Sequence, residues 1–227
     1  MVVLERAEFG YCRSAPTKVT NDPPSRRDIT MLLIILLCIC VILIAIAWYS
    51  GLFSNLHVRV DKCSAASDPF EVQYKVGTGP YWTAGARFKE LATLVPKDAC
   101  LIGIYYDDPK TTASAECRWV VGVVTKSGRD VSLTENFTKQ LTNWGYKTVQ
   151  LPAVKKAVVT THPWTSVISV YLAPMRVYNA MSAFMQAQNL SAHPAMEFYR
   201  DRQIEYCMPL ENQDDYYVPG IERQKRD

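Results

Sequence analysis

The apolar residues of the chain gather first in one uninterrupted run. From Met31 to Tyr49, over 19 positions, the sequence carries no charge. A helix needs about 20 mostly apolar residues to cross the hydrocarbon core of a bilayer, so this run predicts one N-terminal transmembrane helix. A signal peptide is the alternative, because segment 45–47 resembles a cleavage site. The length of the run and the 30 residues before it favour an anchor.

The pattern of polar and apolar positions changes after this run. Segment 70–76 alternates as a half-buried strand does, and Pro80 suits the first turn of a helix. The apolar runs 100–106 and 117–124 predict two further strands. A first unit over residues 70–125 is therefore expected to follow the order strand, helix, strand, strand.

The same order is expected again in residues 154–211. A connecting helix over 132–144, ended by Gly145, separates the two units. The apolar residues at helical spacing in the second unit are Val177, Met181, Phe184 and Met185. Its segments with strand character are 157–161, 195–201 and 204–210. We therefore predict a duplicated β-α-β-β domain of the α+β class, with an antiparallel sheet, over residues 70–211.

Three polar segments flank these elements. Residues 1–30 are rich in Pro, Ser, Thr and Asn and are predicted to be disordered. Residues 50–69 are expected to form a juxtamembrane segment and a first strand, and residues 212–227 a C-terminal tail. The 178 residues beyond the apolar run suffice for one well-buried domain.

Charge and cysteine content exclude some functions. The net charge is +3 from 25 basic and 22 acidic residues, without the clustered basic face that nucleic-acid binding uses, so direct nucleic-acid binding is not expected. None of the seven cysteines forms a Cys-x-x-Cys pair, so we expect neither a metal site nor a cofactor. Four cysteines beyond the run leave disulfides and free thiols equally open.

The orientation in a membrane is not settled by charge. The Lys and Arg residues near the run are Arg13, Lys18, Arg26 and Arg27 before it, and Arg59 and Lys62 after it. This excess favours a cytoplasmic N-terminus. The sequons at Asn136 and Asn189 would be glycosylated only in a lumenal domain. In contrast, Arg223 and Lys225 near the C-terminus resemble a dibasic retrieval signal for the endoplasmic reticulum, which works from the cytosol.

The sequence offers few residues in arrangements that support catalysis. Asp107 and Asp108 look like a carboxylate pair, but neighbours in a strand point to opposite faces, and an Asp before a proline favours a turn. The three histidines, His57, His162 and His193, lie near the membrane or before prolines, with no nucleophile motif beside them. No catalytic residue is therefore predicted.

Several short motifs carry a family resemblance. "YYDDP" at 105–109, "ECRWVVG" at 116–122 and "DDYYVP" at 214–219 follow the anchor in a fixed order. The duplicated pattern resembles the GyrI-like (SHS2-type) small-molecule-binding domain. The order of motifs, over roughly residues 45–221, is similar to the testis-expressed protein 264 family of endoplasmic reticulum membrane proteins. This resemblance implies a single-pass protein with a lumenal N-terminus and a cytosolic domain, at the endoplasmic reticulum and the nuclear envelope.

The resemblance also suggests a groove. It places Glu205 at the acidic position where drug-binding members of the GyrI-like superfamily contact cationic ligands. Arg118 occupies the equivalent place in the first unit, so the two could instead form an ordinary ion pair. Tyr74 and Trp164 complete the candidate groove residues, since aromatic faces attract lipophilic cations.

Three functions follow as hypotheses. The first is an adaptor anchored in the endoplasmic reticulum membrane, resembling a receptor for reticulophagy. Its partners by resemblance are the ubiquitin-like proteins of autophagy and the segregase valosin-containing protein. The second is a membrane-tethered small-molecule sensor or carrier that uses the groove around Glu205. The third, a small-molecule hydrolase, is least favoured, and we expect a protein that is not an enzyme.

Overall fold

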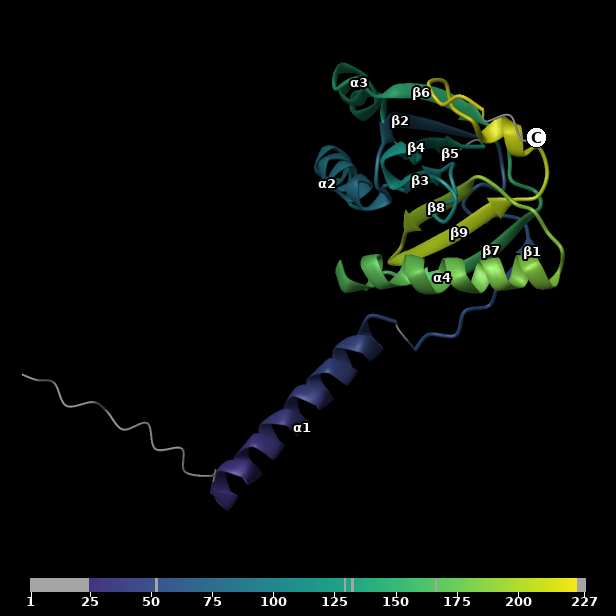
Figure 1. Ribbon diagram of the computed structural model, residues 1–227. Coiled ribbons are helices and arrows are strands. Elements are labelled where there is room, and N and C mark those ends of the chain that lie inside the picture. The colour runs from purple at the N-terminus through teal and green to yellow at the C-terminus, as the bar shows by residue number, and fades with distance from the viewer. Residues whose placement is uncertain (1–24, 52, 129, 132, 166, 224–227) are drawn as a thin grey trace, which may run out of the picture. The chain divides into compact units, whose positions relative to one another are not determined.

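The computed structural model describes residues 25–51, 53–128, 130–131, 133–165 and 167–223 (Figure 1). Its contacts divide the chain into a unit that ends at Leu43 and a unit that starts at Ile44. The first contains most of one helix, and the second contains a sheet domain.

The helix α1 spans Arg26–Tyr49 and has no buried residue. Its start is capped reciprocally: the Ser25 amide donates to the Asp28 carboxylate over 3.0 Å, and the Asp28 amide donates to Ser25 Oγ over 3.3 Å. This cap starts the helix before the predicted position 31, so residues 26–30 are helical. Residues 1–24 of the predicted disordered segment lie outside the described residues. Among those residues, α1 is the one helix long and apolar enough to cross a membrane.

Within its described residues, the sheet domain contains nine strands and three longer helices. The strands are β1 (Arg59–Asp61), β2 (Phe70–Thr78), β3 (Leu101–Tyr105), β4 (Arg118–Ser127), β5 (Asp130–Val131), β6 (Lys147–Leu151), β7 (Ala157–Pro163), β8 (Ala195–Arg200) and β9 (Gln203–Pro209). The helices are α2 (Ala84–Leu94), α3 (Glu135–Asn143) and α4 (Val167–Ala187), and 3-10 turns occur at 81–83, 114–116 and 213–216. The sheet order is β1-β7-β9-β8-β3-β4-β2-β6, with β5 paired to β4, and the pairs are antiparallel.

The α+β class and the antiparallel sheet are confirmed. Both predicted units have the order strand, helix, strand, strand: β2, α2, β3 and β4, then β7, α4, β8 and β9. The antiparallel pair β3–β8 joins them in the middle of the sheet. That the units arose by duplication stays a prediction. The connecting helix α3 is shorter than predicted, and Gly145, with φ of 82°, follows its end.

The sheet is buried on both faces, by different means. On the helix face, α2, α3 and α4 pack on the sheet through residues such as Leu91, Leu141 and Val177. Figure 1 shows α4 running beside β7 and β9. On the coil face, irregular segments cover the sheet, and their buried residues are Cys63, Ala65, Ala66, Val154, Tyr216, Val218 and Ile221. We call these two sides of the sheet the helix face and the coil face.

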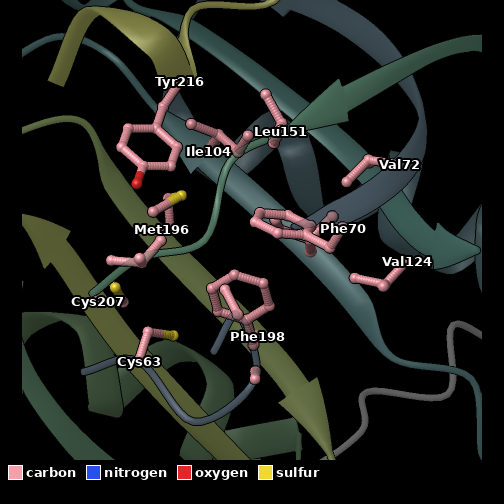
Figure 2. Close-up of a cluster of buried hydrophobic side chains, with 14 of the residues drawn as sticks. Cys63, Phe70, Val72, Ile104, Val124, Leu151, Met196, Phe198, Cys207 and Tyr216 are labelled. Carbon is pink, nitrogen blue, oxygen red and sulfur yellow. The ribbon is translucent and has the colours of Figure 1, made fainter. Parts of the chain in front are cut away.

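The coil-face core is aromatic at its centre. Figure 2 shows Phe70 and Phe198 side by side beneath Tyr216, and the two phenylalanine rings meet edge to face at 5.8 Å. The Tyr74 hydroxyl donates to the Pro219 carbonyl over 3.0 Å. Part of the predicted C-terminal tail is therefore packed into the domain, because its apolar side chains close this face of the sheet.

The hairpin between β8 and β9 turns through Asp201 and Arg202, with φ of 53° and 59°. Positive φ at both central positions matches a type I′ turn, in which Gly is preferred at the second. We expect Arg202→Gly to raise the free energy of unfolding by about 1 kcal/mol, because glycine has no Cβ to clash in this conformation. Urea denaturation measures the change. Arg200→Gly, within β8, is the control and should lower stability. Equal losses in both variants would contradict the expectation.

Candidate functional site

A buried carboxylate lies in the middle of the helix face. Side chains alternate along β8, so Met196 and Phe198 enter the coil-face core while Glu197 and Tyr199 point to the helices. Glu197 is 2% exposed. Charged residues are rarely buried so deeply unless they are paired or hydrogen-bonded, which makes this position unusual.

Tyrosine hydroxyls satisfy the Glu197 carboxylate. Tyr178, from α4, donates to Oε1 over 2.8 Å, and Tyr199 donates to Oε2 over 2.5 Å. Tyr206 lies opposite Glu197 in the register of β9, and its buried hydroxyl has no hydrogen-bond partner among the described residues. With Tyr105 of β3 these residues form the Glu197 cluster, and Tyr105, Tyr178 and Tyr199 provide hydrogen bonds that stabilise the carboxylate.

A missing side chain makes room for the cluster. Gly103 of β3 lies opposite Glu197. A Cβ at this position would come within 3.0 Å of Phe88 Cζ and 3.1 Å of the Tyr105 hydroxyl oxygen. These distances are tighter than ordinary van der Waals contacts, so glycine allows the Tyr105 ring to lie across the strand beside the carboxylate.

Burial dominates the electrostatics of the cluster. It raises the pKa of Glu197, while hydrogen bonds from Tyr199, Tyr178 and Tyr105 act in the opposite direction. Burial also raises the pKa values of Tyr178 and Tyr199, and the neighbouring Glu197 charge raises them further. The tyrosines are therefore neutral hydrogen-bond donors over a wide pH range.

The raised pKa of Glu197 makes stability depend on pH. The folded protein keeps this proton where the unfolded chain, with an ordinary value of 4.5, has lost it. The resulting stabilisation is complete below pH 4.5 and declines as the pH rises through the folded-state pKa. We expect the wild type to lose stability relative to Glu197→Gln over that range. Urea denaturation of both proteins at a series of pH values measures the difference, and a difference independent of pH would contradict this expectation.

A hollow of about 640 Å³ opens beside the cluster. Trp164 and Tyr199 form an aromatic corner of its wall, with ring centroids 5.6 Å apart and planes at 82°. Val95 and Leu101 add apolar surface. We call this the Trp164 hollow. Because Tyr199 both lines the hollow and donates to Glu197, a molecule in the hollow would contact a side chain that holds the carboxylate.

The arrangement suits binding better than bond cleavage. An ionisable carboxylate within aromatic rings can attract a cation by charge and by ring faces. Glu197 accepts hydrogen bonds from Tyr105, Tyr178 and Tyr199. These side chains are phenols and not activated nucleophiles. Within the described residues there is no group of three or more His, Cys, Asp or Glu side chains that could hold a metal ion.

The structure separates the four predicted groove residues. Trp164 lines the hollow on the helix face. Tyr74 is buried in the coil-face core, and Glu205 faces the same side. The Glu205 carboxylate accepts hydrogen bonds from the Ser64 amide over 2.7 Å, the Ser64 hydroxyl over 2.6 Å and the Ala65 amide over 2.9 Å. It fastens the segment that crosses the coil face.

Arg118 has a different partner from the one considered in the sequence. Its Nη2 lies 2.6 Å from Asp107 Oδ1 and its Nε 3.0 Å from Oδ2, a bidentate ion pair. The Arg118 guanidinium also donates to the Glu222 carbonyl. The suggested Glu205–Arg118 pair is thus wrong, because each side chain has its own partners.

The two aspartates of "YYDDP" have distinct structural roles. Asp107 is buried against Arg118 and also accepts from the Arg118 amide over 2.6 Å. Asp108 is exposed, and its Oδ1 accepts from the Lys110 amide over 2.9 Å, as in an Asx turn. Neither lies in the hollow.

Comparison with known proteins gives a consistent set of relatives. Over 185 residues the chain is 34% identical to the testis-expressed protein 264 homolog of Mus musculus, a match that covers 80% of this chain and 58% of the relative. Over 182 residues it is 34% identical to testis-expressed protein 264 of Homo sapiens, covering 79% and 56%. The chain has homologues named testis-expressed protein 264. It spans a little over half the length of these curated relatives, and no family model matches it.

Solved structures are more distant than the testis-expressed protein 264 homologues. The C-terminal domain of EcmrR is 12% identical, with a TM-score of 0.44 and coverage of 69% of this chain and 98% of that one. A conserved protein and a hydrolase from Listeria innocua are 11% and 12% identical, with TM-scores of 0.40 and 0.37. The match to the conserved protein covers 68% of this chain and 91% of that one, and the match to the hydrolase covers 69% and 92%. With TM-scores below 0.5, none of these similarities supports a conclusion about function.

The remaining predicted positions lie outside the hollow. Asn136, within α3, and Asn189, after α4, are both exposed. Arg223 is exposed and donates to the Asp214 carbonyl over 3.1 Å, while Lys225 lies outside the described residues. The predicted span from Met31 to Tyr49 forms part of α1.

Sequence reasoning missed Glu197, although a signal was present. Glu197 stands alone within the apolar strand "AMEFYR", with a tyrosine two positions later on the same face. A carboxylate amid a buried strand requires polar partners. Such a position is a stronger candidate for a functional site than Glu205, which lies in a strand where buried and exposed residues are mixed.

Proposed function

We propose that this protein is an adaptor anchored in the endoplasmic reticulum membrane that holds its sheet domain in the cytosol. The observation that carries the proposal is α1, a 24-residue apolar helix that has no buried residue within the part of the chain that the structure describes. An apolar surface of this size is unfavourable in water and is covered most simply by lipid. The orientation rests on the resemblance to the testis-expressed protein 264 family.

The adaptor acts in turnover of the endoplasmic reticulum. The 34% identity to testis-expressed protein 264 supports this role by homology. Its partners are ubiquitin-like proteins of autophagy and valosin-containing protein, and the nuclear envelope is a further location. Because the chain spans a little over half of these relatives, the whole-protein activity is part of the proposal. The GyrI-like character of the sheet domain belongs to it as well.

Protease treatment of sealed microsomes tests the orientation. We expect the sheet domain to be digested without detergent, while a lumenal marker protein survives. Asn136 and Asn189 should carry no glycan, since both lie on the sheet domain. A domain that is protected until detergent is added, or that is glycosylated at either position, would place it in the lumen and overturn the cytosolic adaptor.

Direct association tests the adaptor role separately from the orientation. The detergent-solubilised full chain should be retained by immobilised autophagy ubiquitin-like protein, and not by immobilised ubiquitin. Retention by neither protein, from a chain that passes the protease test, would leave a membrane-anchored domain without this partner and contradict the role in reticulum turnover.

A second function, binding of a small lipophilic cation, is favoured by the Trp164 hollow beside Glu197. Opening of the Tyr199 side chain would connect the hollow to the buried carboxylate, since the Tyr199 hydroxyl is the link between them. The aromatic rings would hold the apolar part of the cation and Glu197 its charge.

Tetraphenylphosphonium is a suitable probe for this second function. We expect Glu197→Gln to weaken its binding at least about tenfold, because a charge-assisted contact within aromatic walls is lost. The matched control is Glu205→Gln, which removes the same charge on the coil face and should bind like the wild type. Isothermal titration of the three proteins measures the affinities. Equal affinity in all three would exclude Glu197 as the cation site.

A further inference from the structure

The rim of the Trp164 hollow carries charges that the proposed cation site does not use. Three basic residues line it, Lys97, Arg200 and Arg202, together with two acidic residues, Asp98 and Asp201. They come from the loop after α2, from the last residue of β8 and from the β8–β9 turn. The rim therefore combines a basic excess with the apolar wall formed by Trp164 and Tyr199.

Part of the charge is already neutralised. Arg200 Nε lies 3.2 Å from Asp201 Oδ2, so these two side chains satisfy each other. Lys97 and Arg202 take part in no ion pair within the described part of the chain, and their ammonium and guanidinium groups face solvent at the rim. Among the described residues that line the hollow, Asp98 is the one carboxylate that forms no ion pair. The free charges thus favour an anion at the mouth of the hollow.

Arg202 is held at the rim in a conformation that suits glycine better. Its φ is 59°, and its carbonyl accepts a hydrogen bond from the Trp164 amide over 2.7 Å. This bond ties the turn to the aromatic corner. A side chain retained in a strained backbone conformation is often found where the side chain has a use.

The aromatic corner matches the region of a membrane where lipid headgroups meet acyl chains. Trp164 is 37% exposed, an apolar ring with a polar N–H beside basic side chains. Tryptophan and tyrosine concentrate at this depth of a bilayer, and Lys and Arg bind anionic headgroups there. A soluble anion would use the charges but leave the exposed indole without a partner.

The chain also brings the hollow within reach of a bilayer. Nine residues separate Tyr49, the last residue of α1, from Arg59 at the start of β1. They span at most about 30 Å when extended. Within the unit that starts at Ile44, Thr165 at the hollow donates from its hydroxyl to the Tyr49 carbonyl over 2.6 Å. A lipid near the end of α1 is therefore at high effective concentration.

We propose that the Trp164 hollow binds the headgroup of an anionic phospholipid in the membrane that holds α1. Lys97 and Arg202 contact the phosphate, and Trp164 packs against the glycerol and upper acyl chain. The inference rests on the proposed membrane anchorage, but it does not depend on a role in autophagy or on cation binding at Glu197.

Hydrogen exchange of the full chain in lipid nanodiscs tests the proposal. One set of discs contains phosphatidylcholine alone, and the other contains phosphatidylcholine with phosphatidic acid. We expect amides in 95–101 and 199–203 to exchange at least about fivefold more slowly in the anionic discs, since each basic residue near an anionic surface is worth about that factor. High salt should remove the difference, because it screens exposed charges.

Arg202→Gly separates binding from folding. This substitution removes the charge but suits the backbone at φ of 59°, so the melting temperature should be no lower than that of the wild type. The lipid-dependent protection should fall about fivefold. The matched control, Lys147→Gln on β6, removes an exposed charge away from the hollow and should keep the protection. Trp164→Ala should also reduce it.

Several other outcomes would contradict the proposed lipid site. Equal exchange in the two kinds of disc, or full protection in Arg202→Gly, would overturn the lipid site while leaving the anchor intact. The same protection on adding inorganic phosphate to neutral discs would identify a site for soluble phosphate instead. A chain that does not enter discs at all would refute the anchorage, and with it both this inference and the proposed function.

Discussion

Replacing Asp107 with alanine is expected to lower the free energy of unfolding by about 3 kcal/mol. The Asp107 side chain is 1% exposed, and its Arg118 partner is 17% exposed. Removing one member of a buried pair leaves the other charge without compensation, which costs about 3–5 kcal/mol. Because Arg118 is partly exposed, we expect the loss of stability to lie at the lower end of this range. Urea denaturation of the sheet domain within the full chain measures it.

An exposed ion pair provides the control for Asp107. Lys156 and Glu211 lie 3.5 Å apart, and both side chains are more than half exposed. Such pairs contribute little, so Glu211→Ala should change stability by less than about 1 kcal/mol. Suppose instead that Asp107→Ala lowers the free energy of unfolding by no more than Glu211→Ala does. In that case the Asp107–Arg118 pair would not hold the C-terminal segment in place, although Arg118 donates to the Glu222 carbonyl.

Replacing Glu197 with alanine is expected to cost about 4 kcal/mol. The substitution leaves the Tyr178 and Tyr199 hydroxyls without their acceptor, and an unsatisfied buried hydroxyl costs about 1–3 kcal/mol. The cavity left by the side chain adds to this loss. Urea denaturation again gives the value.

The conservative Glu197→Gln variant distinguishes the cause. An amide oxygen can still accept one of the two tyrosine hydrogen bonds, so this variant should lose less than half as much stability at neutral pH. If glutamine and alanine were equally destabilising, an amide oxygen could not replace the carboxyl group as the acceptor of the tyrosine hydrogen bonds. If neither destabilised the protein, the hydrogen bonds of the cluster would be unimportant for folding.

The sequence predicts the order of elements in the sheet domain because turn residues mark the ends of its strands. The segment 195–201 corresponds to β8 and 157–161 to most of β7. The strand β6 was not predicted, since "KTVQL" is short and mostly exposed, and its place beside β2 depends on a pairing between distant segments. Local sequence patterns specify which segments form strands and helices better than they specify which strands pair with each other.

The orientation of the strands could not be predicted in the same way. A sheet with one wet face shows alternating polar and apolar residues, which identifies the buried side. Here both faces are buried, so the central part of β4, "WVVGVV" at 119–124, reads as an unbroken apolar run. Tyr74 and Trp164 therefore looked equally suited to one groove, although they lie on the coil face and the helix face. Glu197 was hidden for the same reason.

The coil face also has a consequence for biosynthesis. Glu205 holds Ser64 across 141 residues of sequence, and Tyr74 holds Pro219 across 145. The ribosome delivers β2 long before the segment that covers it. The nascent chain must therefore keep Phe70 and its neighbours exposed until almost the whole domain has been made, and its folding is late and slow. By then α1 has already emerged, so α1 is free to engage a membrane before the domain behind it has folded.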